Sequence, residues 1–115
     1  MHELGLARGI VDLAHAAATE AGAPRVTAVH VQVGRMAGVE AGALLFSFDI
    51  AAEGSLAEGA RLVIEDVPVA IWCPRCNAEQ ELQGIQRFRC PVCDTPSGDI
   101  RRGRELAVSS IEVES

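Results

Sequence analysis

Aromatic residues are scarce in this sequence. Its 115 residues include one tryptophan, three phenylalanines and no tyrosine. A chain of this length forms one compact domain with at most a small appendage, which argues against a multidomain enzyme. Because rings are few, the core must be built from Ala, Val, Leu and Ile, and a body this small gains from an added cross-link.

Lysine and long apolar runs are absent as well. All ten basic residues are arginine, so a Walker loop is impossible and any associated nucleotide hydrolysis must come from a partner. No run approaches the roughly 20 apolar residues that span a bilayer. The start of the chain lacks the basic and apolar stretches of a signal peptide. We therefore expect a cytoplasmic protein that keeps Met1 with a free amine, because His2 is too bulky for the usual removal of the initiator methionine.

Charge is unevenly distributed along the chain. The formal net charge is −6, yet residues 68–104 contain six arginines against four acids, and the remaining residues contain four arginines against twelve acids. We interpret residues 68–104 as an insertion in an acidic α/β domain formed by residues 1–67 and 105–115. A globally acidic chain binds nucleic acid and anionic membranes poorly, so neither is expected as a partner.

Apolar spacing predicts two helices. Apolar residues between Leu4 and Ala21 fall on one half of a helical wheel, and Gly22 ends the segment. A second amphipathic helix is expected to begin near Glu40 and to end at Gly54.

Three strands complete the expected fold. Alternation between Val29 and Val33 predicts a strand with one buried and one wetter face. A second strand is expected at 61–67 and a third at 105–114, where apolar pairs of opposite parity predict a bulge at Ser109 and Ser110. The fold is therefore expected to be α+β, with a small three-stranded sheet packed with two helices and an inserted four-cysteine domain like a zinc ribbon.

Four cysteines form two closely spaced pairs. Cys73 and Cys76 are followed, after thirteen residues, by Cys90 and Cys93. The spacing is typical of a structural zinc site, because each pair supplies two thiolates from one tight turn and a hairpin brings the turns together. Disulfides or a redox pair are the alternatives, but the cytoplasm keeps thiols reduced and a redox CxxC usually occurs singly. Four thiolates leave no position for a water, so this zinc is not expected to be catalytic.

Residues beside the cysteine pairs fit the same interpretation. The position after each pair often needs a left-handed backbone, which Asn77 and Asp94 tolerate better than other non-glycine residues. Zinc with four thiolates carries a charge of about −2. Arg75, Arg87 and Arg89 lie near enough in the sequence to offset it, and a simple solvated charge is an equally good interpretation of each.

The amino terminus is a second candidate metal site. Met1, His2 and Glu3 offer a free amine, backbone amides that can lose their protons and an imidazole, which together can wrap one metal in a plane. Square-planar nitrogen ligation selects Ni(II) or Cu(II) over zinc. Taken alone the pattern is weak, because many chains begin with Met-His and a terminal histidine is usually only a frayed residue.

The sequence resembles, nearly end to end, the HypA/HybF family of hydrogenase maturation proteins, which are nickel metallochaperones. Any single matching piece is generic, but their order over the whole length is specific. The matching pieces are Met1-His2-Glu3-Leu4, Gly22-Ala23, Val26 to Gly34, Gly38-Val39-Glu40, Glu58-Gly59-Ala60, the two cysteine pairs with their prolines, Gly103-Arg104-Glu105-Leu106 and Ser110 to Glu114.

The resemblance implies a function and a set of site residues. Ni(II) would bind at the Met1 amine, the His2 backbone and imidazole, and the Glu3 backbone nitrogen, with Glu40 a further candidate. The four cysteines would hold a structural Zn(II). The implied partners are a HypB-type GTPase and a hydrogenase large-subunit precursor, to which nickel would be delivered, and no enzyme activity is implied.

Two points stay open on the residues alone. His15 and His30 are better interpreted as surface histidines than as ligands, because exposed histidine is ordinary. The alternative function is a zinc-ribbon adaptor that binds protein or nucleic acid, with the metal purely architectural. The six arginines of residues 68–104 favour the adaptor, whereas the net charge and the near absence of stacking aromatics oppose nucleic-acid binding.

Overall fold

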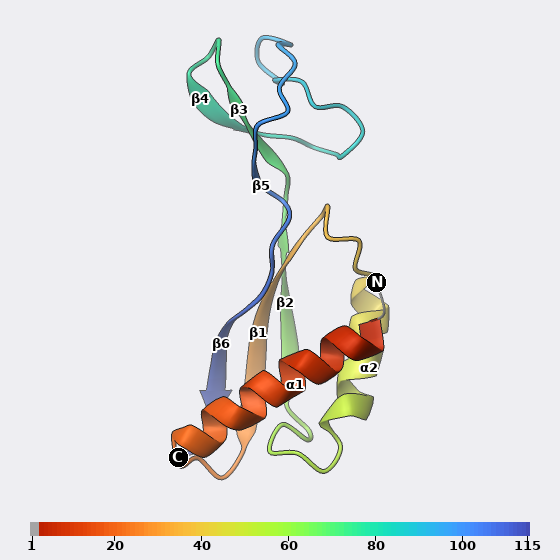
Figure 1. The fold of residues 1–115 in the computed structure, drawn as a ribbon, viewed down its shortest axis with the longest axis vertical. Coiled ribbons are helices and arrows are strands. Elements are labelled where there is room, and N and C mark those ends of the chain that lie inside the picture. Colours follow the sequence, from red (N-terminus) through yellow and green to blue (C-terminus); the bar gives the residue numbers. More distant parts are fainter. Residues whose placement is uncertain (1–2) are drawn as a thin grey trace. The chain divides into compact units, whose positions relative to one another are not determined.

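A computed structural model describes residues 3–115 and shows eight helices and strands in that part of the chain (Figure 1). The chain divides into two compact units. One unit, the body, comprises Met1–Val31, Val39–Glu65 and Ala107–Ser115. The other, the ribbon, comprises Gln32–Gly38 and Asp66–Leu106, so it includes a short segment that the expected division placed in the body. No helix of residues 3–115 is long and apolar enough to cross a bilayer.

Two helices form the apolar layer of the body, which confirms the expected α+β class. Helix α1 spans Glu3–Glu20 and α2 spans Ala41–Ala52, and the two pack against each other. Helix α1 ends as predicted, because Gly22 adopts a φ of 69° and donates to the carbonyl of Thr19. The following N–H, of Ala23, donates to the carbonyl of Ala18, which completes a Schellman motif. The buried residues of the helices are Ala7, Ile10, Val11, Ala14 and Ala18 of α1 and Leu44, Phe48 and Ala52 of α2.

The first three-stranded sheet has the order β2-β1-β6. Its strands are β1 (Val26–Gly34), β2 (Arg61–Val67) and β6 (Leu106–Val113). Val29, Val31 and Val33 of β1 are buried as the alternation predicts, while His30 and Gln32 are half-buried. Figure 1 shows α1 crossing in front of β1.

The expected bulge in β6 is wrong as stated. Glu114 donates to the carbonyl of Arg25, and Gly34 donates to the carbonyl of Glu105. The segments Arg25–Gly34 and Glu105–Glu114 therefore contain the same number of residues. A bulge in β6 alone would add one residue to the β6 segment, so it is excluded. In β1, Ala28 and Val29 are both buried, so the buried side chains switch from one face of the strand to the other at this point. Strand β6 makes the same switch opposite these residues, so the two strands change face together.

The ribbon contains the second sheet, of order β4-β3-β5. Strands β3 (Ala70–Cys73) and β4 (Ala78–Glu81) form an antiparallel hairpin, and β5 (Ile100–Arg102) pairs with the other side of β3. The small core contains Val69, Ile71 and Leu82, with Met36, Phe88 and Ile100 packed against it.

Two glycines of the ribbon lie in very close contact. A Cβ added at Gly34 would lie 2.1 Å from the carbonyl oxygen of Gly103. Gly103 itself has a φ of 118°, and a Cβ there would lie 2.9 Å from the Cα of Val69. Only glycine allows the backbones to approach this closely, and only glycine readily adopts that φ.

Candidate metal centre

The two cysteine pairs form two similar turns. Asn77 and Asp94, which follow the pairs, have φ angles of 53° and 64°, and they are the two non-glycine residues with positive φ in residues 3–115. The left-handed backbone that the sequence predicts at these positions is confirmed. Within each turn, ahead of this residue, a backbone N–H meets sulfur. In the first turn the N–H of Cys76 donates to Cys73 Sγ at 3.3 Å. In the second turn the N–H of Val92 donates to Cys90 Sγ at 3.4 Å.

The four sulfur atoms converge on one point. All of them lie within 4.8 Å of one another. Cys73 Sγ lies 3.5 Å from Cys93 Sγ, and Cys76 Sγ lies 3.8 Å from Cys90 Sγ. A tetrahedral metal with metal–sulfur bonds of about 2.3 Å separates its sulfur ligands by about 3.8 Å. A disulfide would need about 2.05 Å, so the sulfur atoms fit metal ligation and are not cross-linked to one another.

The elements that carry the cysteines explain this convergence. Cys73 is the last residue of β3, and its partner in the hairpin is Ala78 on β4, so the first turn is held by the sheet. The second turn is held by its own backbone, since the N–H of Cys90 donates to the Thr95 carbonyl and the N–H of Asp94 donates to the Cys90 carbonyl. Cys73 and Cys90 are buried, and the other two sulfur-bearing residues are half-buried. The site is therefore closed on one side by protein.

The thiols of Cys76 and Cys93 differ in acidity. Thr95 lowers the pKa of the Cys93 thiol to about 6, because its hydroxyl, 3.1 Å from Sγ, and its backbone N–H both favour the thiolate. The pKa of Cys76 is raised to about 12, first by its hydrogen bond with Cys93 and then by loss of solvent. Negative charge thus concentrates on Cys93 while Cys76 holds its proton. A divalent cation that binds here must displace protons, so its affinity falls as the pH falls.

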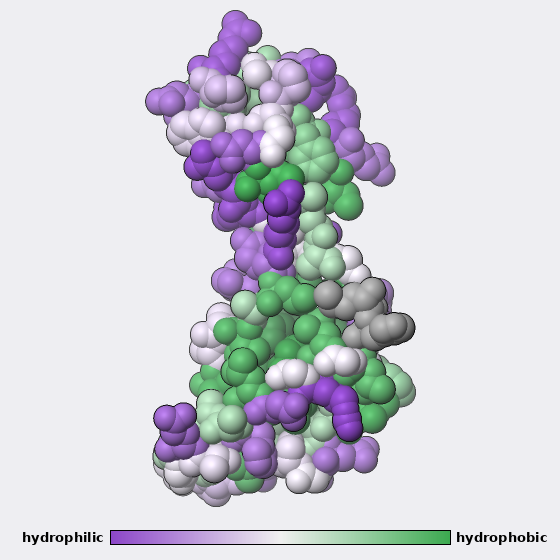
Figure 2. Space-filling model, in the orientation of Figure 1, coloured by the Kyte–Doolittle hydropathy of each residue, from purple (hydrophilic) through white to green (hydrophobic). Residues whose placement is uncertain are grey.

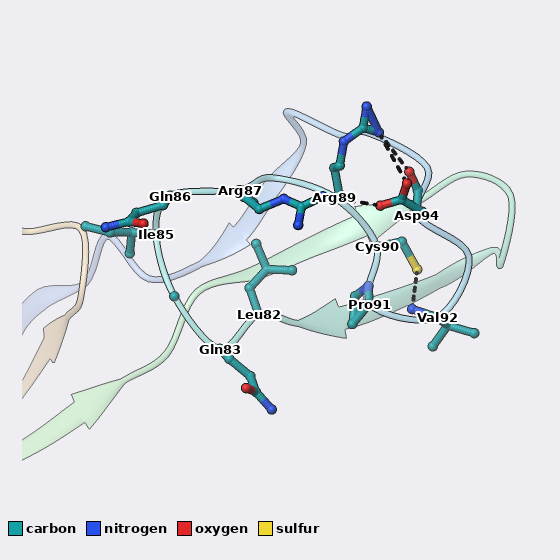
Figure 3. Close-up of a pocket in the computed structure, with 11 residues that line it drawn as sticks. Leu82, Gln83, Ile85, Gln86, Arg87, Arg89, Cys90, Pro91, Val92 and Asp94 are labelled. Carbon is teal, nitrogen blue, oxygen red and sulfur yellow. Dashed lines mark hydrogen bonds and ion pairs between the residues drawn. The ribbon is translucent and has the colours of Figure 1, made fainter.

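Two of the three arginines near the cysteines pair with Asp94. Arg89 donates to the Asp94 carbonyl at 3.0 Å, and its guanidinium lies 3.8 Å from the carboxylate (Figure 3). Arg87 lies 3.9 Å from the same carboxylate. Arg75 forms no ion pair with any of residues 3–115. The geometry therefore assigns Arg87 and Arg89 to the aspartate of the second turn, and compensation of thiolate charge by the three arginines stays a prediction.

A hollow of about 770 Å³ lies beside the second turn. Figure 3 shows Ile85, Leu82 and Val92 among its lining side chains, together with Cys90 and the arginines that pair with Asp94. The lining contains no histidine and no serine or threonine hydroxyl. Its one thiol, of Cys90, belongs to the four-sulfur cluster, and its one carboxylate, of Asp94, pairs with Arg87 and Arg89.

The candidate nickel ligands Met1 and His2 lie outside the residues that the structure describes. Glu3, the third residue of the motif, is the first residue of α1. The first N–H groups of a helix have no partner within the helix. The backbone nitrogen of Glu3 is therefore not committed to α1.

Glu40, near which the second helix was expected to begin, has a structural role. It is the N-cap of α2, where Oε1 accepts from the N–H of Gly42 at 3.1 Å and Oε2 accepts from the N–H of Ala43 at 2.5 Å. Both carboxylate oxygens are thus engaged in capping the first turn of α2. Among residues 3–115, Glu40 belongs to no cluster of three or more His, Cys, Asp or Glu side chains that could hold a metal.

The two remaining histidines form hydrogen bonds within the body. His15 Nδ1 accepts from the N–H of Leu56 at 3.0 Å, which ties α1 to the segment before β2. His30 Nε2 lies 2.5 Å from Glu112 Oε2 on the neighbouring strand. Sequence analysis missed both contacts because their partners are distant in the chain. Thr95 was missed as well, although its position two residues after Cys93 places it within reach of that sulfur.

Comparison with known proteins gives a consistent result. The family model described as hydrogenase/urease nickel incorporation, metallochaperone, hypA matches residues 1–113. Hydrogenase maturation factor HypA of Chloroflexus aurantiacus strain J-10-fl is 54% identical over 112 residues, which cover 97% of this chain and 98% of that protein. HypA of Roseiflexus sp. strain RS-1 is 43% identical over 114 residues, which cover 99% of this chain and 93% of that protein.

Solved structures agree on the fold. A solution structure of a HypA protein is similar with a TM-score of 0.73 at 23% identity, covering 99% of this chain and 97% of that chain. The solution structure of the Ni metallochaperone HypA from Helicobacter pylori is similar with a TM-score of 0.67 at 21% identity, covering 100% of this chain and 99% of that chain. The match of the family model over nearly the whole chain and the high identity to curated relatives show that this chain belongs to the HypA family of hydrogenase/urease nickel-incorporation metallochaperones, which are maturation factors and not enzymes.

Proposed function

We propose that this protein binds Ni(II) at its amino terminus in the cytoplasm and delivers it during maturation of nickel–iron hydrogenase. The observation that carries the proposal is the family match over residues 1–113, which includes the Met1-His2-Glu3 motif. Family membership favours this function over the adaptor alternative.

The chemistry of the motif suits Ni(II). The Met1 amine, the His2 imidazole and the backbone nitrogens of His2 and Glu3 would supply a planar set of nitrogen ligands. The Glu3 nitrogen supports this assignment because it is the first of α1 and has no helical partner. A terminal site is accessible, so an acceptor can replace its ligands one at a time.

The charge of the body supports the same role. Its residues include ten acids and three arginines, a net charge of −7, whereas the ribbon has six acids and seven arginines. A negative field attracts divalent cations and basic protein surfaces. Nickel and a basic partner are thus drawn to the unit that carries the motif.

The ribbon would hold Zn(II) as a structural ion. The ligands would be Cys73, Cys76, Cys90 and Cys93, whose sulfur separations suit a tetrahedron. When bound, zinc supplies a cross-link between the two turns and no open coordination position. Cross-linking matters here because the buried apolar core of the ribbon is small.

We infer that the partners are a HypB-type GTPase and the hydrogenase large-subunit precursor. The absence of lysine supports a GTPase partner, because this chain cannot form a Walker loop. Delivery to a urease is a further use that the family description includes.

Calorimetric titration with Ni(II) tests the terminal site. We expect His2→Ala, and separately one extra residue before Met1, to abolish the terminal binding isotherm, because each removes a ligand from the planar set. His15→Ala is the matched control, since the His15 side chain accepts a hydrogen bond from a backbone N–H in the body. Elemental analysis should show that every variant keeps its zinc. Nickel binding that survives both terminal changes would exclude the proposed site.

A further inference from the structure

Helix α2 carries large apolar side chains that are exposed and do not pack in the core. Ser47 and Asp49 are its only residues with polar side chains, so it is apolar on every side. Leu44 and Phe48 are buried in the body, whereas Phe46 is 70% exposed. A helix that is apolar all round is normally covered all round. A cluster of exposed apolar residues marks a surface that meets another molecule.

The exposed residues form one face of the helix. Ile50 is 46% exposed and lies one turn after Phe46, while Leu45, 42% exposed, lies at the edge of the same face. Gly42 lies one turn before Phe46 and adds no side chain to this face. In Figure 2, hydrophobic surface is visible on the side of the body where α1 and α2 lie.

Two carboxylates lie on this face as well. Asp49 and Glu53 are one turn apart and both are exposed. Neither forms an ion pair with any of residues 3–115. Helix α2 contains no arginine, so nothing on the helix itself neutralises them. The face is thus both apolar and negatively charged.

This combination selects the occupant. A second copy that packed the same face against itself would oppose the carboxylates of Asp49 and Glu53 with their own equivalents, which is repulsive. Anionic membranes are repelled for the same reason. A segment with apolar side chains flanked by arginine or lysine would cover Phe46 and Ile50 and pair with both acids.

We propose that the exposed face of α2, formed by Gly42, Leu45, Phe46, Asp49, Ile50 and Glu53, is a docking surface for a basic amphipathic helix of a partner protein. Packing of a helix against this face follows the common mode in which apolar residues spaced by one turn anchor a helix on an apolar surface. The inference is independent of nickel binding, since none of these residues belongs to the amino-terminal motif.

Nuclear magnetic resonance titration with two designed helical peptides tests the surface. One peptide carries leucine on one face and arginine on the other, and its counterpart carries glutamate in place of arginine. We expect the leucine–arginine peptide to bind and to shift the amide resonances of residues 42–53. Phe46→Ser should weaken this binding by about tenfold or more, as expected for an aromatic anchor. The double variant Asp49→Arg with Glu53→Arg should reverse the preference between the two peptides.

Ile85→Ser is the matched control, because Ile85 is 47% exposed but lies in the ribbon. It should leave peptide affinity unchanged, and circular dichroism should show that Phe46→Ser remains folded. Equal peptide affinity of Phe46→Ser and the native protein would overturn the proposal. Two other results would also overturn it: a concentration-dependent dimer of the native protein in sedimentation that Phe46→Ser does not form, or binding of the native protein to phosphatidylserine vesicles that Phe46→Ser does not show. Nickel affinity should be unchanged in all these variants. A negative result for the docking surface would therefore not contradict the proposed nickel site at the amino terminus.

Discussion

Glu112 Oε2 lies 2.5 Å from His30 Nε2, and this contact joins the edge strand β6 to the central strand β1. The hydrogen bond with His30, followed by attraction to His30 and Arg61, lowers the pKa of the Glu112 carboxyl below its ordinary value of 4.5. The folded protein therefore favours the ionised carboxylate. Its contribution to stability is present above pH 4.5 and is lost as the pH falls through the lowered pKa.

Glu112→Gln should reduce the acid sensitivity of folding. We expect the native protein to lose more free energy of unfolding than the variant when the pH falls from neutral through the lowered pKa of Glu112, because only the native protein has a carboxylate at position 112 that takes up a proton. Urea unfolding followed by circular dichroism at neutral pH and below that pKa measures the difference. Glu65→Gln is the control, since Glu65 is exposed and forms no ion pair with residues 3–115. An identical pH dependence of Glu112→Gln and the native protein would contradict the linkage.

Glu40→Ala should destabilise the body by about 1 kcal/mol, because it removes the N-cap of α2. The two lost hydrogen bonds are those to the N–H groups of Gly42 and Ala43. Glu40→Ser should restore most of the stability, since serine is a good N-cap residue. Urea unfolding compares the three proteins. Calorimetry on Glu40→Ser separates a nickel role from the cap: weaker Ni(II) binding in a fully stable Glu40→Ser protein would assign Glu40 to nickel handling.

Cys76→Ala should lose zinc and unfold the ribbon while the helices persist. Trp72, the only tryptophan, reports on the ribbon, because Ser97 donates to its carbonyl at 2.6 Å and the Arg101 guanidinium lies 4.9 Å from its ring. We expect its fluorescence to shift to the red. The helical circular dichroism should remain, since α1 and α2 belong to the body.

Arg75→Ala is the control for this experiment, because it changes the same turn without removing a sulfur. It should keep one zinc per chain and native tryptophan emission. One tightly held zinc in Cys76→Ala, measured by elemental analysis, would refute the four-thiolate assignment.

Local features of the sequence predicted what depends on neighbouring residues. Helix α1 follows the 3.6-residue spacing and ends at Gly22, whose freedom at positive φ needs no tertiary contact. The turns at the cysteine pairs were predictable for the same reason, because Asn77 and Asp94 tolerate a left-handed backbone by themselves. The sheet order and the geometry of β6 were harder to predict. The alternation of apolar residues in one strand does not reveal that the neighbouring strand changes face at the same place.

Contacts between residues distant in the chain could not be read from spacing. The pairing of His30 with Glu112 and the hydrogen bond from Leu56 to His15 depend on which strands and segments become neighbours. Membership of Gln32–Gly38 in the ribbon is of the same kind, since Met36 packs against a core supplied by a different part of the chain.

By itself the sequence determined the helices, the four-cysteine motif and the Met1-His2-Glu3 terminus, because periodicity, ligand type and short spacings are properties of adjacent residues. Tertiary structure alone decided which apolar residues of α2 are covered. The helix is apolar on every side, so its sequence cannot say which side faces the core, and only packing of Leu44 and Phe48 into the body leaves Phe46 exposed.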